Sequence, residues 1–168
     1  MRLIIFLFLY FFSTSALQAQ SVFDTASCGG NSRLQGFTAD KIFARSQQWV
    51  TSNIKPLTYT ENETNGSILI TSLEDYNAQT ADKLPKKYSG KFQYTFVVQT
   101  RDSAYSYDFI NVKFIPAAML EQTLRNPEES NSKPIKMKRR TWEKITRSAH
   151  RQLQEKGRKY DAYMQACK

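Results

Sequence analysis

The sequence is poor in the side chains from which most active sites are built. Its 168 residues include a single histidine, His150, and only two cysteines, Cys28 and Cys167. These residues do not follow the spacing of a zinc site, and a cysteine nucleophile would need His150 and an orienting group beside it. Neither a glycine-rich phosphate loop nor a nucleophile elbow occurs. The sequence therefore predicts a protein that is not an enzyme, without catalytic residues, metal site or cofactor.

Long hydrophobic runs are also scarce, and the one present stands at the N-terminus. Residues 3–12 are all apolar, follow Met1-Arg2, and precede small residues that end at Ala19. A membrane helix needs about twenty residues, so this run is short for a bilayer span. The layout is typical of a secretory signal peptide over residues 1–19, with an uncleaved N-terminal anchor as the alternative. We therefore expect an exported protein, periplasmic or secreted.

Export would affect the oxidation state of the two cysteines. In an oxidising compartment a single pair of cysteines is more often a disulfide than two reactive thiols. Cys28 and Cys167 lie near opposite ends of the mature chain. Closing so long a loop would stabilise the fold by roughly 4–5 kcal/mol in the chain-entropy model. A Cys28–Cys167 disulfide is thus a hypothesis, and two unpaired cysteines are the alternative.

Acidic residues are scarce at one end of the chain only. The net charge is +9, yet residues 1–132 hold 12 basic and 12 acidic residues and are neutral. Residues 133–168 hold 12 basic and 3 acidic residues. The charge excess therefore belongs entirely to a C-terminal tail.

Alternation of apolar and polar residues over 91–115 predicts an antiparallel hairpin with one face on a core. In the first strand Phe92, Tyr94, Phe96 and Val98 stand at even positions, and the other face is polar except for Val97. In the second strand the apolar residues stand at odd positions as far as Phe109 and at even positions beyond it. Such a change of phase predicts a bulge or bend near Phe109, or burial of both faces further on. The polar residues 101–104 are expected to form the tight turn.

A second amphipathic pattern precedes the hairpin. Apolar residues at helical spacing over 39–53 predict a helix that begins near Thr38 or Asp40. Trp49 is interpreted as its core anchor, with a ligand-stacking tryptophan as the alternative. Other expected elements are strands at 57–61 and 67–73 around a turn at 62–66, a long polar connection at 74–90 that is mobile or functional, and a short helix at 117–125.

The tail has its own helical pattern. Trp142, Ile145, Ala149 and Leu153 are spaced as one apolar stripe of a helix, which Gly157 is expected to break or kink. His150 is interpreted as a solvated residue of this helix.

The expected fold class is α+β, an antiparallel sheet packed by an N-terminal helix, followed by a long basic C-terminal helix. The expected layout is a signal peptide (1–19), a flexible lead-in (20–36), a folded domain (37–125), a linker (126–135) and a basic amphipathic helical tail (136–168).

Four short motifs carry a family resemblance. They are the run FTADKIFAR at 37–45, the triplet QWV at 48–50, NGSI at 65–68 and the aromatic hairpin. Over about residues 37–115 the chain resembles an uncharacterised family of exported bacterial proteins with a TBP-like fold, a helix packed on a curved antiparallel sheet. The resemblance implies this fold and a cell-envelope setting, but it carries no established activity or site residues. A TBP-like fold does not by itself imply DNA binding.

Two surfaces are candidates for binding, which makes an exported, non-catalytic binding or envelope-associated module the expected function. The first is an aromatic sheet face with Tyr105 and Tyr107, which would take a peptide, glycan or partner domain; the alternative is that both are core residues. The second is the basic tail, whose helix would bind a polyanion. The alternative is a solvated helix that only packs its apolar stripe on the folded domain. The tail's partner would be an anionic membrane surface or an envelope protein rather than nucleic acid. A hydrolase with a Cys–His site is the remote alternative. The basic candidates are Lys136, Lys138, Arg139, Arg140, Lys144, Arg147 and Arg151.

Overall fold

The computed structural model describes residues 28–120 and 137–166. Their elements, in chain order, are β1 (Gly30–Arg33), α1 (Ala39–Asn53), β2 (Pro56–Asn62), β3 (Ser67–Tyr76), α2 (Ala78–Asp82), the 3-10 helix η1 (Lys86–Tyr88), β4 (Gly90–Arg101), β5 (Ala104–Pro116) and α4 (Arg139–Gln165). Residues 117–120 are helical as well, and the rest of the helix expected at 117–125 lies outside the described residues.

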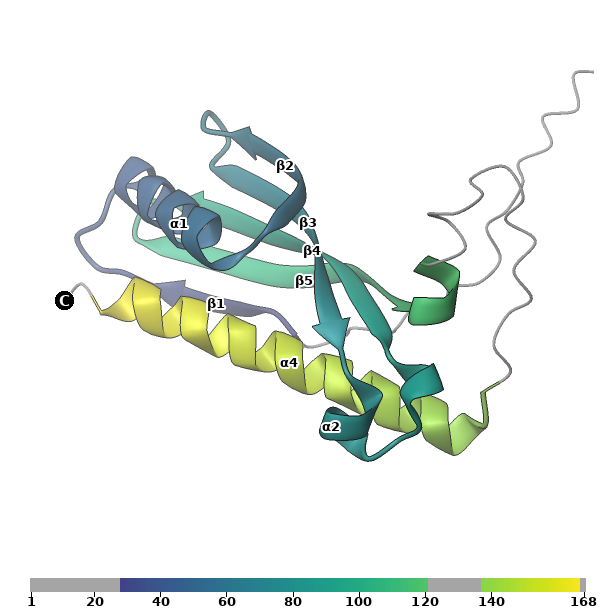
Figure 1. Cartoon of the computed structure of the whole chain (residues 1–168). Coiled ribbons are helices and arrows are strands. Elements are labelled where there is room, and N and C mark those ends of the chain that lie inside the picture. The colour runs from purple at the N-terminus through teal and green to yellow at the C-terminus, as the bar shows by residue number, and fades with distance from the viewer. Residues whose placement is uncertain (1–27, 121–136, 167–168) are drawn as a thin grey trace, which may run out of the picture.

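The strands form one antiparallel sheet of five, in the order β1-β5-β4-β3-β2 (Figure 1). The aromatic hairpin supplies its centre, because β4 pairs with β5 on one side and with β3 on the other. The two strands join through Asp102 and Ser103, and Ser103 has a φ of +57°. Helices α1 and α4 cover the same face of this sheet, since Tyr160 of α4 packs on Trp49 of α1 and on Phe96 of β4. The expected α+β architecture is confirmed.

The predicted change of phase in β5 is a β-bulge. Gln93 of β4 pairs with Lys113, and Thr95 pairs with Ile110, so β5 contains one residue more than β4 between the paired positions. Asn111, inside the bulge, has a φ of +54°. The extra residue returns the apolar side chains beyond it to the helix-covered face. The buried residues of β5 are Tyr105, Tyr107, Phe109, Val112, Phe114 and Pro116.

Helix α1 has the predicted bounds, and Trp49 is part of the core with 4% of its surface exposed. Thr38 is the N-cap residue, but its side chain makes no capping hydrogen bond. Instead, Asp102 in the β4–β5 turn accepts a hydrogen bond of 2.7 Å from the backbone N–H of Ala39. A carboxylate at this position also interacts favourably with the helix dipole.

The expected flexible lead-in over 20–36 is wrong for residues 30–33, which form β1 and pair with β5. Its sequence, GNSR, shows no apolar alternation, because a short edge strand is held by backbone hydrogen bonds rather than by a buried face. The backbone of β1 packs closely on the Tyr107 side chain because Gly30 has no Cβ. A Cβ added at Gly30 would lie 2.8 Å from the Tyr107 hydroxyl oxygen.

The C-terminal helix is not a separate tail. Its apolar stripe joins the same core as the sheet, and α4 continues through Gly157 without a break. Gly157 instead packs on the ring of Tyr107. The buried apolar side chains of α4 are Ile145, Ala149, Leu153, Tyr160 and Met164.

The connection at 74–90 is more ordered than its polar composition suggests. Strand β3 extends to Tyr76, and α2 and η1 follow. The side chain of Asn77 caps α2 by accepting hydrogen bonds from the N–H groups of Gln79 and Thr80. Helix α2 lies beside α4 (Figure 1).

Candidate binding surfaces

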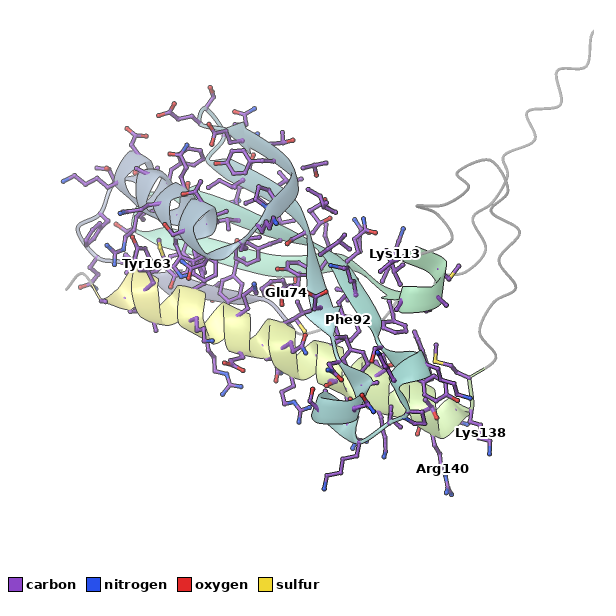
Figure 2. The ribbon with its side chains drawn as sticks, in the orientation of Figure 1. Glu74, Phe92, Lys113, Lys138, Arg140 and Tyr163 are labelled. Atoms are coloured by element: carbon purple, nitrogen blue, oxygen red, sulfur yellow. The ribbon has the colours of Figure 1, made fainter. Side chains whose placement is uncertain are left out.

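Five basic side chains form one line along the outer side of α4. They recur at intervals of three, four or seven residues, which places them on one side of a helix, and all of them are exposed. We call this set the cationic stripe: Arg140, Lys144, Arg147, Arg151 and Arg158. At 1.5 Å per residue it is about 27 Å long. In Figure 2 the side chain of Arg140 points away from the sheet, and so does that of Lys138, just before the helix begins.

The cationic stripe has few acidic partners. Two acidic residues of α4 form ion pairs with cations that are not members of the stripe, because Glu143 pairs with Arg139 and Glu155 with Lys159, each at 2.9 Å. Among the described residues, no ion pair includes a member of the stripe. Like charges three or four residues apart destabilise a helix by roughly 0.2–0.5 kcal/mol per pair. Binding of an anion would relieve this repulsion.

The opposite side of α4 is buried in the core. A basic amphipathic helix binds a bilayer by burying its apolar face among the lipids. In this protein that face packs on the sheet, with Ile145 fully buried and Leu153 2% exposed. Only the polar side of α4 is therefore available to a partner. Within the described residues, none of the helices has the length and hydrophobicity needed to cross a membrane.

The remaining predicted basic residues are not members of the stripe, and Arg139 is instead paired with Glu143. Lys138 and Arg139 are exposed at the N-terminal end of α4. Lys136 lies outside the described residues.

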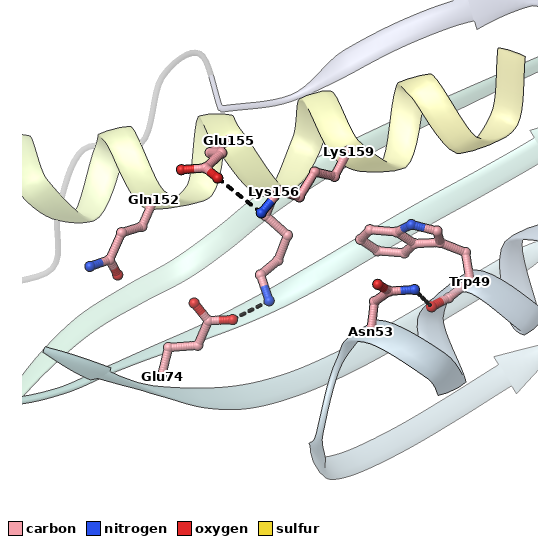
Figure 3. A pocket seen from close by; sticks show the side chains of 7 residues that line it. All are labelled: Trp49, Asn53, Glu74, Gln152, Glu155, Lys156 and Lys159. Atoms are coloured by element: carbon pink, nitrogen blue, oxygen red, sulfur yellow. Dashed lines mark hydrogen bonds and ion pairs between the residues drawn. The ribbon is translucent and has the colours of Figure 1, made fainter. Parts of the chain in front are cut away.

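A second candidate site is a cavity of about 280 Å³ between α1, β3 and α4 (Figure 3). Sequence reasoning missed it, because its side chains come from three elements far apart in the chain and form no local motif. The lining residues are Trp49, Asn53, Glu74, Gln152, Glu155, Lys156 and Lys159.

A half-buried ion pair stands at this cavity. Lys156 pairs with Oε1 of Glu74, and the two side chains are only 16% and 28% exposed. The same Oε1 accepts a hydrogen bond of 2.9 Å from the hydroxyl of Tyr94. Burial, and then the Glu74 carboxylate, raise the pKa of Tyr94, so this tyrosine remains a protonated donor. Figure 3 shows Lys156 reaching across from α4 to Glu74.

The proposed aromatic face at Tyr105 and Tyr107 is wrong, because α4 covers it. The exposed fractions are 2% for Tyr105 and 9% for Tyr107. Both rings pack on Tyr160, and the hydroxyl of Tyr105 donates to Asp161 at 2.6 Å. Burial, together with Asp161, raises the pKa of each tyrosine to about 12. These side chains are core residues.

Cys28 and His150 are neighbours, although they are 122 residues apart in the sequence. The Sγ of Cys28 lies 3.2 Å from Nδ1 of His150, which is half-buried rather than solvated. Burial and then the Asp108 carboxylate raise the pKa of the Cys28 thiol. A protonated, buried thiol is a poor nucleophile.

Disulfide formation remains a prediction. Cys28 is a free thiol in the structure, and Cys167 lies outside the described residues. No group of three or more potential metal ligands occurs in the part of the chain that the structure describes.

Comparisons with known proteins agree on the fold. The family DUF4468, described as a domain of unknown function with TBP-like fold, matches residues 31–114. A DUF4468 family protein from Bacteroides ovatus has a similar structure, with a TM-score of 0.61, 12% identity and 89% of each chain covered. A TBP-like protein from Parabacteroides distasonis has a TM-score of 0.59 and 12% identity, with 83% of this chain and 92% of that chain covered.

At 12% identity these structures show a shared fold and nothing about activity. No curated protein matches the chain. The family match spans the sheet from β1 into β5, and the similarity to the solved structures covers most of the chain. The chain belongs to the DUF4468 family, domains of unknown function with a TBP-like fold.

Proposed function

We propose that this protein is an exported, non-catalytic binding module that adsorbs to anionic lipid head groups through the cationic stripe of α4. The observation that carries the proposal is the stripe itself. Five exposed cations stand in a line, outside every ion pair of the described residues, on a helix whose other side is fixed in the core.

The mode of binding follows from the packing. Because the apolar face of α4 is buried, adsorption would be electrostatic and would not include insertion into the hydrocarbon. Each Lys or Arg near an anionic surface contributes about 1 kcal/mol. Five such residues would give weak but measurable adsorption. Exposed charges are screened over about 10 Å at 0.1 M salt, so binding would fade as salt is added.

Two further features support this role. The signal-peptide layout at residues 1–19 would place the protein at the cell envelope, where lipid phosphates are abundant and nucleic acid is not. The Cys28–His150 pair lacks the exposed, low-pKa thiol that a cysteine nucleophile needs, which supports a binding role over a hydrolase.

Charge reversal on α4 tests the proposal. In vesicle co-sedimentation at low salt, the mature protein without residues 1–19 is expected to bind anionic phosphatidylglycerol vesicles and not neutral phosphatidylcholine vesicles. The triple variant Arg140→Glu, Lys144→Glu and Arg147→Glu is expected to lose this binding, since it places three repelling charges on the stripe.

The matched control reverses three exposed cations on other elements, Lys41→Glu, Lys55→Glu and Arg101→Glu. It changes the net charge equally and is expected to keep most of the binding. Equal loss in both variants would mean that net charge rather than the stripe causes adsorption. Absence of wild-type binding at low salt would reject the proposed function.

A further inference from the structure

We propose that the cavity between α1, β3 and α4 is a binding site for a neutral saccharide of about one sugar residue. This inference is independent of the lipid-binding role, because the cavity and the cationic stripe share no residue. The cavity volume of about 280 Å³ lies near the lower limit of ordinary small-molecule sites, which favours a single sugar unit.

The charges of the lining favour a neutral ligand. Two carboxylates, Glu74 and Glu155, stand against two ammonium groups, Lys156 and Lys159. Each carboxylate is already paired with one of the ammonium groups. The lining therefore has no net charge to attract an anion or a cation.

Hydrogen-bonding capacity remains after these pairs have formed. Oε1 of Glu74 accepts both from Tyr94 and from Lys156, whereas no described residue donates to Oε2. Asn53 uses its Nδ2 to donate to the Trp49 carbonyl, which leaves its Oδ1 as an acceptor. The Gln152 amide makes no hydrogen bond within the described part of the chain. A half-buried ion pair is stable only when its remaining donors and acceptors also find partners, from water or from a ligand.

Hydroxyl groups suit this lining better than the charged ends of an amino acid. A ligand carboxylate would compete with Glu74 or Glu155 for a lysine, and a ligand ammonium would compete with the lysines. A hydroxyl accepts from Lys156 and donates to Oε2 of Glu74 at the same time, so it joins the ion pair without breaking it. Adjacent hydroxyls of a pyranose would extend this pattern to Gln152 and Asn53.

Trp49 gives the cavity a rigid apolar wall. Its ring packs on Tyr160, with centroids 5.0 Å apart, and on Phe96, with centroids 6.0 Å apart. Only 4% of the residue is exposed, so its position is fixed before a ligand arrives. Binding beside the indole is expected to change its fluorescence.

The experiment titrates the mature protein without residues 1–19 with glucose, galactose, mannose and N-acetylglucosamine, with glycine as a zwitterionic probe. Calorimetry and tryptophan fluorescence serve as readouts, and a Trp142→Phe background isolates the signal of Trp49. We expect at least one sugar to bind saturably, with a Kd of about 10 mM or lower. This binding is expected to persist in high salt, unlike vesicle adsorption.

Gln152→Ala is the diagnostic variant, because Gln152 has no partner in the described chain whose loss would disturb the fold. It is expected to weaken sugar binding about fivefold or more, the effect of one lost hydrogen bond. Gln154→Ala, the same change on the exposed side of α4, is expected to leave binding unchanged. Saturable binding of glycine alone, no binding of any sugar, or equal affinity of Gln152→Ala and wild type would each overturn the proposal.

Discussion

At the scale of single residues, the packing around Tyr107 depends on two glycines. A Cβ added at Gly157 would lie 2.8 Å from Cε2 of Tyr107, and one added at Gly30 would lie 2.9 Å from Cε1. The ring is therefore held between the backbones of β1 and α4, with one glycine at each of its edges. Gly157 sits in the interior of a helix, where glycine is ordinarily unfavourable, because it permits this contact.

We predict that Gly157→Ala destabilises the protein, although alanine is the better helix former. Alanine would gain about 1 kcal/mol in helix propensity, whereas forcing a methyl group into a packed core costs about 1–3 kcal/mol. The expected result is a net loss of about 1 kcal/mol in the free energy of unfolding, measured by urea titration. The second change Tyr107→Phe should recover part of this loss, because it removes the hydroxyl from the crowded site. A Gly157→Ala variant more stable than wild type would contradict the packing.

The burial and contacts of single residues were the features hardest to predict from the sequence. Alternation shows that Tyr105 and Tyr107 share a face, but it does not show whether a helix covers that face. The contact of Cys28 with His150 joins the beginning of the described chain to its last helix, so no local spacing could reveal it. The cavity of Glu74 and Lys156 was missed for the same reason.

At the scale of elements, the β4–β5 turn holds residues 34–39 in place through hydrogen bonds. Its Asp102 caps α1, and the carbonyl of Ser103 accepts a hydrogen bond of 2.9 Å from the N–H of Leu34. The N–H of Ser103 in turn donates to the carbonyl of Phe37 at 2.9 Å. The turn therefore determines where α1 begins.

We predict that Asp102→Ala lowers the free energy of unfolding by about 1 kcal/mol, the ordinary cost of losing an N-cap. Asp102→Asn keeps an oxygen acceptor and should lose only part of this stability. Asp40→Ala, which removes a carboxylate from the first turn of α1 itself, is the control for the helix dipole. If denaturant titration gave the same stability for Asp102→Ala and wild type, the cap across the turn would contribute nothing.

Elements with a strong periodic signal were predicted well from the sequence. The apolar stripe of α1 and the alternation of the hairpin each reflect one face buried against a core, and the bulge in β5 appeared as a change of phase. Strand β1 was missed because it is short and polar, and its pairing with β5 is made by backbone groups. Backbone pairing leaves no trace in the side-chain pattern.

At the scale of the whole molecule, the protein has one core that both ends of the described chain complete. Tyr160, near the end of α4, packs on rings from α1, β4 and β5, and its hydroxyl lies 2.8 Å from Oγ of Ser46 in α1. The sequence suggested a domain followed by a basic tail, because composition changes sharply near residue 133. Charge composition describes the exposed side of α4 and says nothing of where its apolar side packs.

We predict that a chain ending at residue 136 does not fold. Four large side chains of α4, Ile145, Leu153, Tyr160 and Met164, are buried in the shared core. Each contributes roughly 1.5–3 kcal/mol on burial, so their sum approaches the 5–15 kcal/mol total stability of an ordinary domain. Removing α4 would also expose Tyr105, Tyr107 and Phe96 to water.

Circular dichroism and thermal unfolding of the truncated chain measure this effect. The expected result is the absence of a cooperative transition, whereas a sharp transition close to that of the full chain would show that the sheet and α1 form a domain of their own.

The distinction also decides how the cationic stripe must be studied. If α4 is part of the core, a deletion that abolishes vesicle binding reports only unfolding, and charge reversal on the intact helix is the change that isolates its electrostatic role.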